Sequence, residues 1–278
     1  MTRLKLISVS LLISVLSVNT VVADDDAPRT ALKVCADPNY QPFSSKDLSG
    51  YENRIAAIIG ESLNLPVEYT WFPQRMGFIR STLRKENPDG KGHLCDLVIG
   101  VPKGFGMAAT SKPYLRSTYG LVVSTAGKLA PLESAQQFPE LAAKTDGLRV
   151  AVTERSPGSE LMAKYGLFDE IAPYIAQSGD PNEFPGQPML EDLLAGKVDA
   201  AIVWGPTAAH FVRTAGDKLK MFPLASEAGV RFDYEISAAV RYGEDEWEEQ
   251  VNRILEENAP KIQAIMEEYG IPVVKSDG

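Results

Sequence analysis

The sequence predicts an α/β protein built of two lobes that are joined by two crossings of the chain. Strand-like and helix-like segments alternate from residue 31 onward, and a second series of the same kind begins near residue 148. A strand leaves the first series near residue 120, and another returns near residue 236. Two crossings make a hinge, so we expect facing loops at the carboxyl ends of the strands to line one cleft.

The first series reads as strand, helix, strand, helix, strand, which is typical of βαβ units. Apolar residues recur at helical spacing in residues 52–63. Residues 95–101 form a continuous apolar run of the kind buried on both faces of a parallel sheet. The predicted elements are strands at 31–36, 67–71 and 95–101 and helices at 52–63 and 77–85.

The second series follows a Leu/Pro/Ala-rich connection after a strand at residues 119–124. Its predicted elements are strands at 148–153 and 198–203, helices at 158–165 and 189–195, and a short helix after the Gly-Pro pair at 205–206. The chain then returns through a strand at 236–242.

A helix at 245–257 carries Trp247 and Val251 on its inward face, and Pro260 restarts the helix as a first-turn residue. Gly270 and Pro272 stop it. The acidic run at 244–249 suits a solvated helix start, with a metal or partner site as the weaker alternative. The predicted domains are lobe 1, residues 24–120 plus 237–278, and lobe 2, residues 121–236.

Residues 1–23 read as a signal peptide, because basic residues precede an apolar run and a small-residue cleavage signal at 21–23. The run is shorter than the roughly 20 residues that a membrane span needs, so a permanent anchor is the weaker alternative. No later segment has the length and hydropathy of a span. We therefore expect export to the periplasm.

The charge balance disfavours two classes of partner. The leader carries Arg3 and Lys5 and no acid, so the net charge of −9 becomes −11 in the mature chain. A balance of this sign disfavours nucleic acids and anionic membrane surfaces and permits a basic protein partner.

Cys35 and Cys95 are the only cysteines, and export places them where thiol pairs oxidise. We predict a disulfide between them, with two buried free thiols as the alternative. In the chain-closure model this crosslink stabilises the fold by about 4 kcal/mol.

Material for catalysis or metal binding is sparse. The only histidines, His93 and His210, are too few and isolated for a zinc site, and no nucleophile or phosphate-binding motif is present. Asp37 with Glu52 or Glu154 is a conceivable acid pair, although nothing in their spacing selects it. We predict no metal, no cofactor and no catalytic residue.

Material for recognition is richer, because aromatic and polar residues follow the ends of predicted strands. The loop at 37–43 carries Asp37, Asn39, Tyr40 and Phe43, and the loop at 71–78 carries Trp71, Arg75 and Phe78. Ser156 precedes a helix whose N–H groups can hold an anion, and Trp204 ends a buried strand. Packing of the aromatic rings in the core and a plain helix cap at Ser156 are the competing interpretations.

The order of these signals resembles the polar amino-acid family of periplasmic binding proteins, with the type II fold, across the mature chain. The resemblance is carried by Asn-Tyr-Gln-Pro-Phe at 39–43, Gly-Tyr-Glu at 50–52, Ser-Lys-Pro-Tyr at 111–114, Leu-Ala-Gly-Lys-Val-Asp-Ala at 194–200 and Tyr-Gly at 269–270. The family's amino-acid binders usually carry an arginine before the Pro-Tyr signal, and residues 104–110 contain none. They also carry an aspartate where this chain has Trp204. Free amino acids are therefore disfavoured as ligands.

A narrower set of motifs resembles the MxaJ/XoxJ subfamily. These motifs lie at 34–39, 50–56, 69–75, 77–80, 95–102 and 114–119, and the last of them contains Arg116. The resemblance implies a monomeric, periplasmic, non-catalytic protein associated with a methanol dehydrogenase that uses pyrroloquinoline quinone (PQQ) and calcium or a lanthanide, with a role in maturing or activating that enzyme.

The resulting hypothesis is an accessory protein whose cleft binds the dehydrogenase or a peptide-like segment. The predicted ligand or partner contacts are Asp37, Asn39, Tyr40, Phe43, Glu52, Trp71, Arg75, Phe78, Arg116, Ser156 and Trp204. One alternative is a solute-binding protein of an ABC importer for a small ligand that is not an amino acid. An enzyme of the dehydratase or glycan-cleaving kind is a weaker alternative, because some proteins of this fold have such activities.

Overall fold

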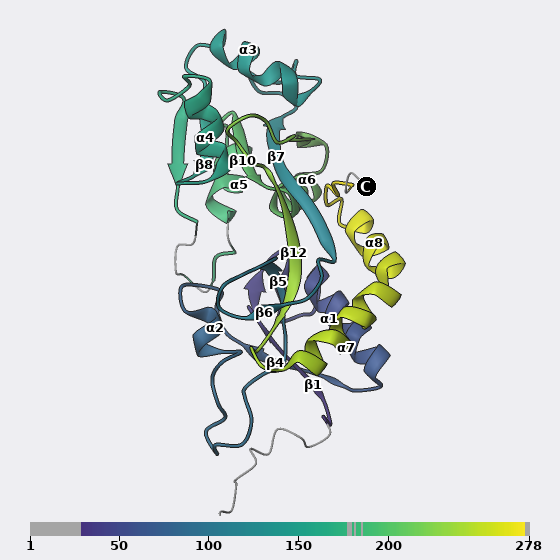
Figure 1. The fold of residues 1–278 in the computed structure, drawn as a ribbon. Coiled ribbons are helices and arrows are strands. Elements are labelled where there is room, and N and C mark those ends of the chain that lie inside the picture. Colours follow the sequence, from purple (N-terminus) through teal and green to yellow (C-terminus); the bar gives the residue numbers. More distant parts are fainter. Residues whose placement is uncertain (1–28, 177–179, 181, 185, 276–278) are drawn as a thin grey trace, which may run out of the picture.

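The computed structural model describes residues 29–176, 180, 182–184 and 186–275, so the predicted signal peptide at 1–23 lies outside the described residues. Two long strands, β7 (Leu115–Ser124) and β12 (Asp233–Val240), run between a lower and an upper part of the molecule (Figure 1).

The remaining elements fall on either side of these strands. The lower part contains β1 (Leu32–Ala36), β2 (Asn39–Tyr40), β3 (Ser44–Ser45), α1 (Tyr51–Leu63), β4 (Val67–Trp71), α2 (Phe78–Ser81), β5 (Val98–Pro102), β6 (Ala109–Thr110), α7 (Asp245–Glu257) and α8 (Ala259–Glu268). The upper part contains α3 (Phe138–Ala143), β8 (Val150–Thr153), α4 (Pro157–Lys164), β9 (Ile171–Tyr174), α5 (Gln187–Leu194), β10 (Ala200–Trp204), α6 (Gly205–Ala215) and β11 (Leu219–Pro223).

One mixed sheet extends through both parts. Its strand order is β5-β12-β7-β10-β8-β9, while β6 pairs with β12 and β11 with β7. The first half of β7 pairs antiparallel with β12, and its second half pairs with β10 and β11. The two crossing strands are therefore hydrogen-bonded to each other where the chain passes between the parts.

Alternation along the strands gives the upper part a core on each face of its sheet. Leu121 and Ile202 pack in a cluster with residues of α3 and α4, whereas Val122 and Ala201 pack with residues of α5 and α6. Successive strand residues point to opposite faces, so the upper part has three layers.

The lower part has the same arrangement. Ile99 and Val240 belong to a cluster with α1, α7 and α8, and the neighbouring residues Val98 and Ala239 belong to a smaller cluster with α2 and the two cysteines. Helical periodicity produces this packing, because the apolar residues of α1, α7 and α8 recur on one face.

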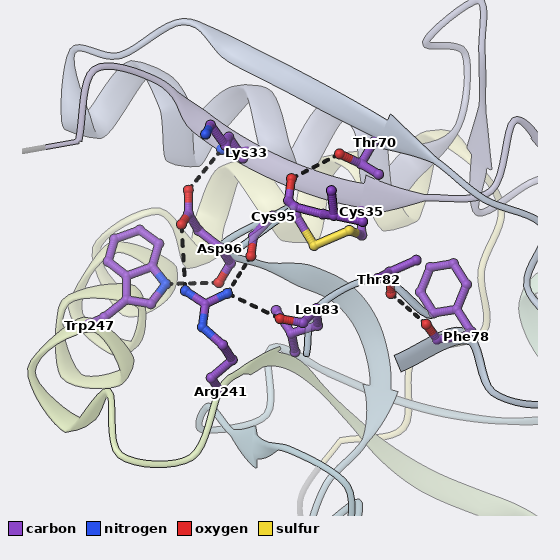
Figure 2. The surroundings of a disulfide bond; sticks show 11 residues. Lys33, Cys35, Thr70, Phe78, Thr82, Leu83, Cys95, Asp96, Arg241 and Trp247 are labelled. Atoms are coloured by element: carbon purple, nitrogen blue, oxygen red, sulfur yellow. Dashed lines mark hydrogen bonds and ion pairs between the residues drawn. A yellow bond between two sulfur atoms is a disulfide. The ribbon is translucent and has the colours of Figure 1, made fainter. Parts of the chain in front are cut away.

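The predicted disulfide between Cys35 and Cys95 is present, and it closes a sequence separation of 60 residues (Figure 2). Arg241 beside it donates hydrogen bonds to the carbonyl oxygens of Cys95 and Leu83 and lies 3.7 Å from the Asp96 carboxylate. The indole N–H of Trp247 donates to the Asp96 carbonyl oxygen at 3.0 Å. The end of β12 and the start of α7 thus hold the loop that contains Cys95.

The C-terminal segment after α8 also contacts the crossing strand β7. We call residues 270–275 the C-terminal strap. The Ser117 hydroxyl donates to the Pro272 carbonyl oxygen at 2.7 Å, and the Val274 N–H donates to the Arg116 carbonyl oxygen at 2.9 Å. The strap therefore lies along β7 at the level where the two parts meet.

Several predicted elements differ from the structure in their bounds, and two of them differ in a way that bears on the fold. The strand predicted at 95–101 begins at Val98 and pairs antiparallel with β12, and its parallel contact to β1 is a single bridge between Leu97 and Val34. The segment therefore meets β1 in parallel on one side, as expected, and the returning strand β12 pairs antiparallel on the other side. The helix predicted at 77–85 covers Phe78–Ser81 only, since Thr82 leaves helical geometry.

Among the described residues, no helix is long and apolar enough to cross a membrane. The lobe boundaries at 24–120 plus 237–278 and at 121–236 stay a prediction.

Candidate functional site

The loop after β1 is held in place by Asp37. Its buried carboxylate accepts hydrogen bonds from the backbone N–H groups of Asn39, at 2.8 Å, and Gln74, at 2.5 Å. Its carbonyl oxygen accepts from the Ser44 hydroxyl at 2.9 Å. Asp37 therefore joins three segments and positions the two predicted aromatic residues that follow it.

Tyr40 and Phe43 stack with their ring centroids 4.5 Å apart, and Phe43 in turn packs on Tyr51. Phe43 is buried and Tyr40 is half-buried. Burial raises the pKa of the Tyr40 hydroxyl, and the nearby acids Glu52 and Asp37 raise it further. The hydroxyl stays protonated at neutral pH and can donate a hydrogen bond.

Glu52 is a buried carboxyl group in the first turn of α1. It packs against Gly100, whose φ is +82°; a Cβ on Gly100 would lie 1.9 Å from Glu52 Oε1. Burial raises the Glu52 pKa well above its ordinary value, and a hydrogen bond from Tyr51 opposes the shift. The protonated acid is therefore favoured, as expected for a desolvated carboxyl without a cationic partner.

The second predicted loop does not join this group as a unit. Trp71 stacks on Tyr69 at 4.6 Å with nearly parallel rings. Phe78 is buried in the cluster around the disulfide, while Arg75 is exposed. The core-packing interpretation of Phe78 agrees with its position.

Trp204 lies where the two parts meet, in a group of aromatic rings from three strands. Its ring centroid is 5.5 Å from that of Tyr119 on β7 and 6.0 Å from that of Tyr234 on β12. Burial raises the pKa of Tyr119 to about 12. Sequence reasoning missed Tyr119 and Tyr234, although both lie on the strands that it expected to cross between the lobes.

The last two predicted residues have clear positions. Arg116 donates from Nε and Nη2 to one oxygen of Asp233, at 2.9 and 2.6 Å, and so joins β7 to β12. Ser156 precedes α4; its buried hydroxyl has no hydrogen-bond partner among the described residues.

A groove of about 660 Å³ lies between the two parts. None of the eleven predicted contact residues lines it, although Gln41 and Pro42 in the predicted loop do. The groove is lined by Gln41, Pro42, Ser49, Phe184, Gln187, Leu190, Glu191, Leu194, His210, Arg213, Thr214 and Tyr269.

Contacts across this groove connect α6 with the lower part. The Arg213 guanidinium lies 4.6 Å from the ring centroid of Tyr269, and the Tyr269 hydroxyl donates to the Ser49 carbonyl oxygen at 2.5 Å. Phe184 meets the His210 ring edge-on at 5.1 Å. Burial and the charge of Arg213 lower the His210 pKa, so neutral imidazole is favoured. The motifs at 39–43, 194–200 and 269–270 each contain residues that line this groove.

The described part of the chain holds no group of three or more histidine, cysteine, aspartate or glutamate side chains arranged to bind a metal.

The chain is similar in sequence and in structure to known proteins. No protein-family model matches the chain. MoxJ of Methylorubrum extorquens is 28% identical over 257 residues, which cover 87% of this chain and 81% of MoxJ. The crystal structure of the periplasmic binding protein XoxJ from Methylobacterium extorquens AM1 is 28% identical, with a TM-score of 0.70 over 88% of this chain and 100% of that chain. MxaJ from Methylophaga aminisulfidivorans gives the same identity, TM-score and coverage.

These likenesses cover 87% or 88% of the chain. They confirm the predicted type of fold and the predicted resemblance. The chain is similar to MoxJ and to the solved XoxJ and MxaJ structures, and it has the α/β fold of the periplasmic binding proteins.

Proposed function

We propose that this protein is a periplasmic, non-catalytic accessory of a PQQ-dependent methanol dehydrogenase system. It binds the dehydrogenase, or a peptide-like segment, between its two lobes and assists maturation or activation of the enzyme. The similarity to XoxJ, a periplasmic binding protein, supports the compartment and the binding role.

The observation that carries the proposal is the environment of Trp204. The position that holds an aspartate in amino-acid binders of the resembling family carries an indole here, packed against Tyr119 and Tyr234. An amino acid would leave its ammonium group without a partner at this position, which is costly away from water. Half-buried aromatic rings with polar tips suit a protein partner better, because such residues are enriched at interfaces.

The predicted acids also favour binding over catalysis. Both Asp37 carboxylate oxygens accept backbone hydrogen bonds, and Glu52 lies beneath Gly100. A general base needs a free oxygen within reach of the substrate proton, so these contacts suit structural roles.

The test is capture of the dehydrogenase from periplasmic extract with the mature protein, followed by calorimetric titration of its apo and holo forms. We expect saturable binding that is stronger for the apo form. Changing Tyr40, Trp71 and Trp204 together to Ala should weaken binding by about 100-fold, because interface aromatics contribute about 2 kcal/mol or more when they are hot spots. The control variant changes the exposed residues Phe168 and Tyr242 to Ala.

Unchanged binding by the folded triple variant would contradict the proposal. A small molecule copurifying with the protein, without any dehydrogenase, would favour the importer alternative instead.

A further inference from the structure

The groove between the parts has an apolar wall. Pro42, Phe184, Leu190 and Leu194 contribute to its lining, and Leu194 is 45% exposed. Leu190 and Pro42 are buried and Phe184 is half-buried, so Leu194 is the exposed apolar residue of this wall. A concave surface with apolar lining between two parts is typical of a recognition site.

A single arginine lies at the edge of this wall. The face of the Arg213 guanidinium rests on the Tyr269 ring, which the hydrogen bond to Ser49 holds in place. Stacking engages the face of a guanidinium and leaves its N–H groups, which lie in the plane, able to donate. Arg213 is therefore oriented before any partner arrives.

Two acidic side chains in this region have other partners, although the charge of Arg213 also acts on Glu268. Glu268 pairs with Arg54 at 2.5 Å, and Glu191 accepts a hydrogen bond from Gln187 at 2.8 Å. None of the ion pairs among the described residues includes Arg213.

We propose that this groove binds an acidic peptide segment of a protein partner, with a carboxylate on Arg213 and an adjacent apolar side chain against Phe184, Leu190 and Leu194. The planar, bidentate donor geometry of arginine matches a carboxylate. The inference rests on the proposed function in placing a protein partner between the lobes.

The test uses the mature protein and two probe peptides, acetyl-Leu-Glu-Phe-Glu-Leu-amide and its Gln-for-Glu counterpart, in calorimetric titrations at low salt. We expect the Glu peptide to bind at least about tenfold more tightly than the Gln peptide. Arg213→Gln should abolish this difference, and Arg213→Lys should keep part of it. Arg253→Gln is the matched control, because Arg253 is an exposed arginine in a separate surface hollow.

Equal binding of the two peptides, no binding of the Glu peptide, or an unchanged preference in Arg213→Gln would overturn the inference. Binding of decanoate with the same dependence on Arg213, in the absence of peptide binding, would overturn the assignment to a peptide. Dehydrogenase capture separates the two proposals. If the protein binds the Glu peptide but captures no dehydrogenase, only the proposed function is contradicted. If it captures the dehydrogenase but does not bind the Glu peptide, only the peptide site is contradicted.

Discussion

Glu52 shows how a single residue changes its chemistry through tertiary contacts. An acid in the first turn of a helix is ordinarily stabilised by the helix dipole as a charged, solvated group. Here burial beneath Gly100 and between tyrosine side chains raises its pKa. The pattern Gly-Tyr-Glu indicated that the residue matters, but the spacing of acids along the chain does not reveal what covers them.

We expect Glu52→Gln to flatten the pH dependence of stability. A carboxyl whose pKa is raised in the folded state contributes stability that is fully present below its unfolded pKa, near 4.3, and is lost as the pH rises through the folded pKa. Each unit by which the pKa is raised corresponds to about 1.4 kcal/mol. We expect the free energy of unfolding, measured with urea, to fall more between pH 5 and pH 8 in the natural protein than in Glu52→Gln.

The control for this experiment is Glu61→Gln, which changes an exposed acid on the same helix. Identical pH dependence in the natural protein and Glu52→Gln would show that the carboxyl is hydrated rather than desolvated.

At the scale of elements, strongly periodic segments were predicted well. The helices α1, α7 and α8 lie where the spacing of apolar residues placed them, to within one residue for α1. The strand β9 was missed because Pro173 interrupts it, and proline is tolerated only at edges such as the one β9 forms. The helix α3 was missed within the Leu/Pro/Ala-rich connection. Local pattern is thus decisive for long elements and weak for short ones.

Gly205, at the start of α6, packs tightly against the crossing strand β7 and the C-terminal strap. A Cβ on Gly205 would lie 2.2 Å from the Thr118 carbonyl oxygen and 2.6 Å from Pro272 Cγ. Gly205→Ala should therefore lower the free energy of unfolding by about 1–3 kcal/mol, because a packed backbone contact must move. Chemical denaturation measures the change.

Gly106→Ala is the matched control, since a Cβ there has no atom within 4 Å. Its unfolding free energy should be unchanged or higher by about 0.4–1 kcal/mol, because alanine restricts the unfolded chain. Equal stability of Gly205→Ala and Gly106→Ala would mean that α6 does not press on the C-terminal strap.

At the scale of the whole molecule, the C-terminal strap adds a third link to the two crossing strands. Ile271 is buried in the core cluster of the lower part. Pro272 and Val274 form hydrogen bonds with β7, and Arg213 of the upper part stacks on Tyr269. Three links restrict rotation of the two predicted lobes more than two would, so we expect the strap to limit how far the groove opens.

Removal of the strap should widen the distribution of distances between the lobes. Spin labels at the exposed residues Glu61 and Lys144, each changed to Cys, report one distance across the molecule. A chain that ends at Gly270 should show a broader distribution in pulsed electron spin resonance, and a chain that ends at Lys275 keeps the contacts and serves as the control. Equal widths for both chains, with melting curves confirming that both are folded, would exclude a restraining role.

By itself, the sequence determined the α/β class, the two series of elements, the disulfide between Cys35 and Cys95 and the resemblance to the MxaJ/XoxJ subfamily. These features depend on periodicity, composition and local motifs, which are properties of short stretches of chain. Only the tertiary structure decided that β5 pairs antiparallel with β12, that Phe78 is core, and that Arg213, Tyr269 and Phe184 share a groove. Such contacts join residues far apart in sequence, and packing between elements selects them.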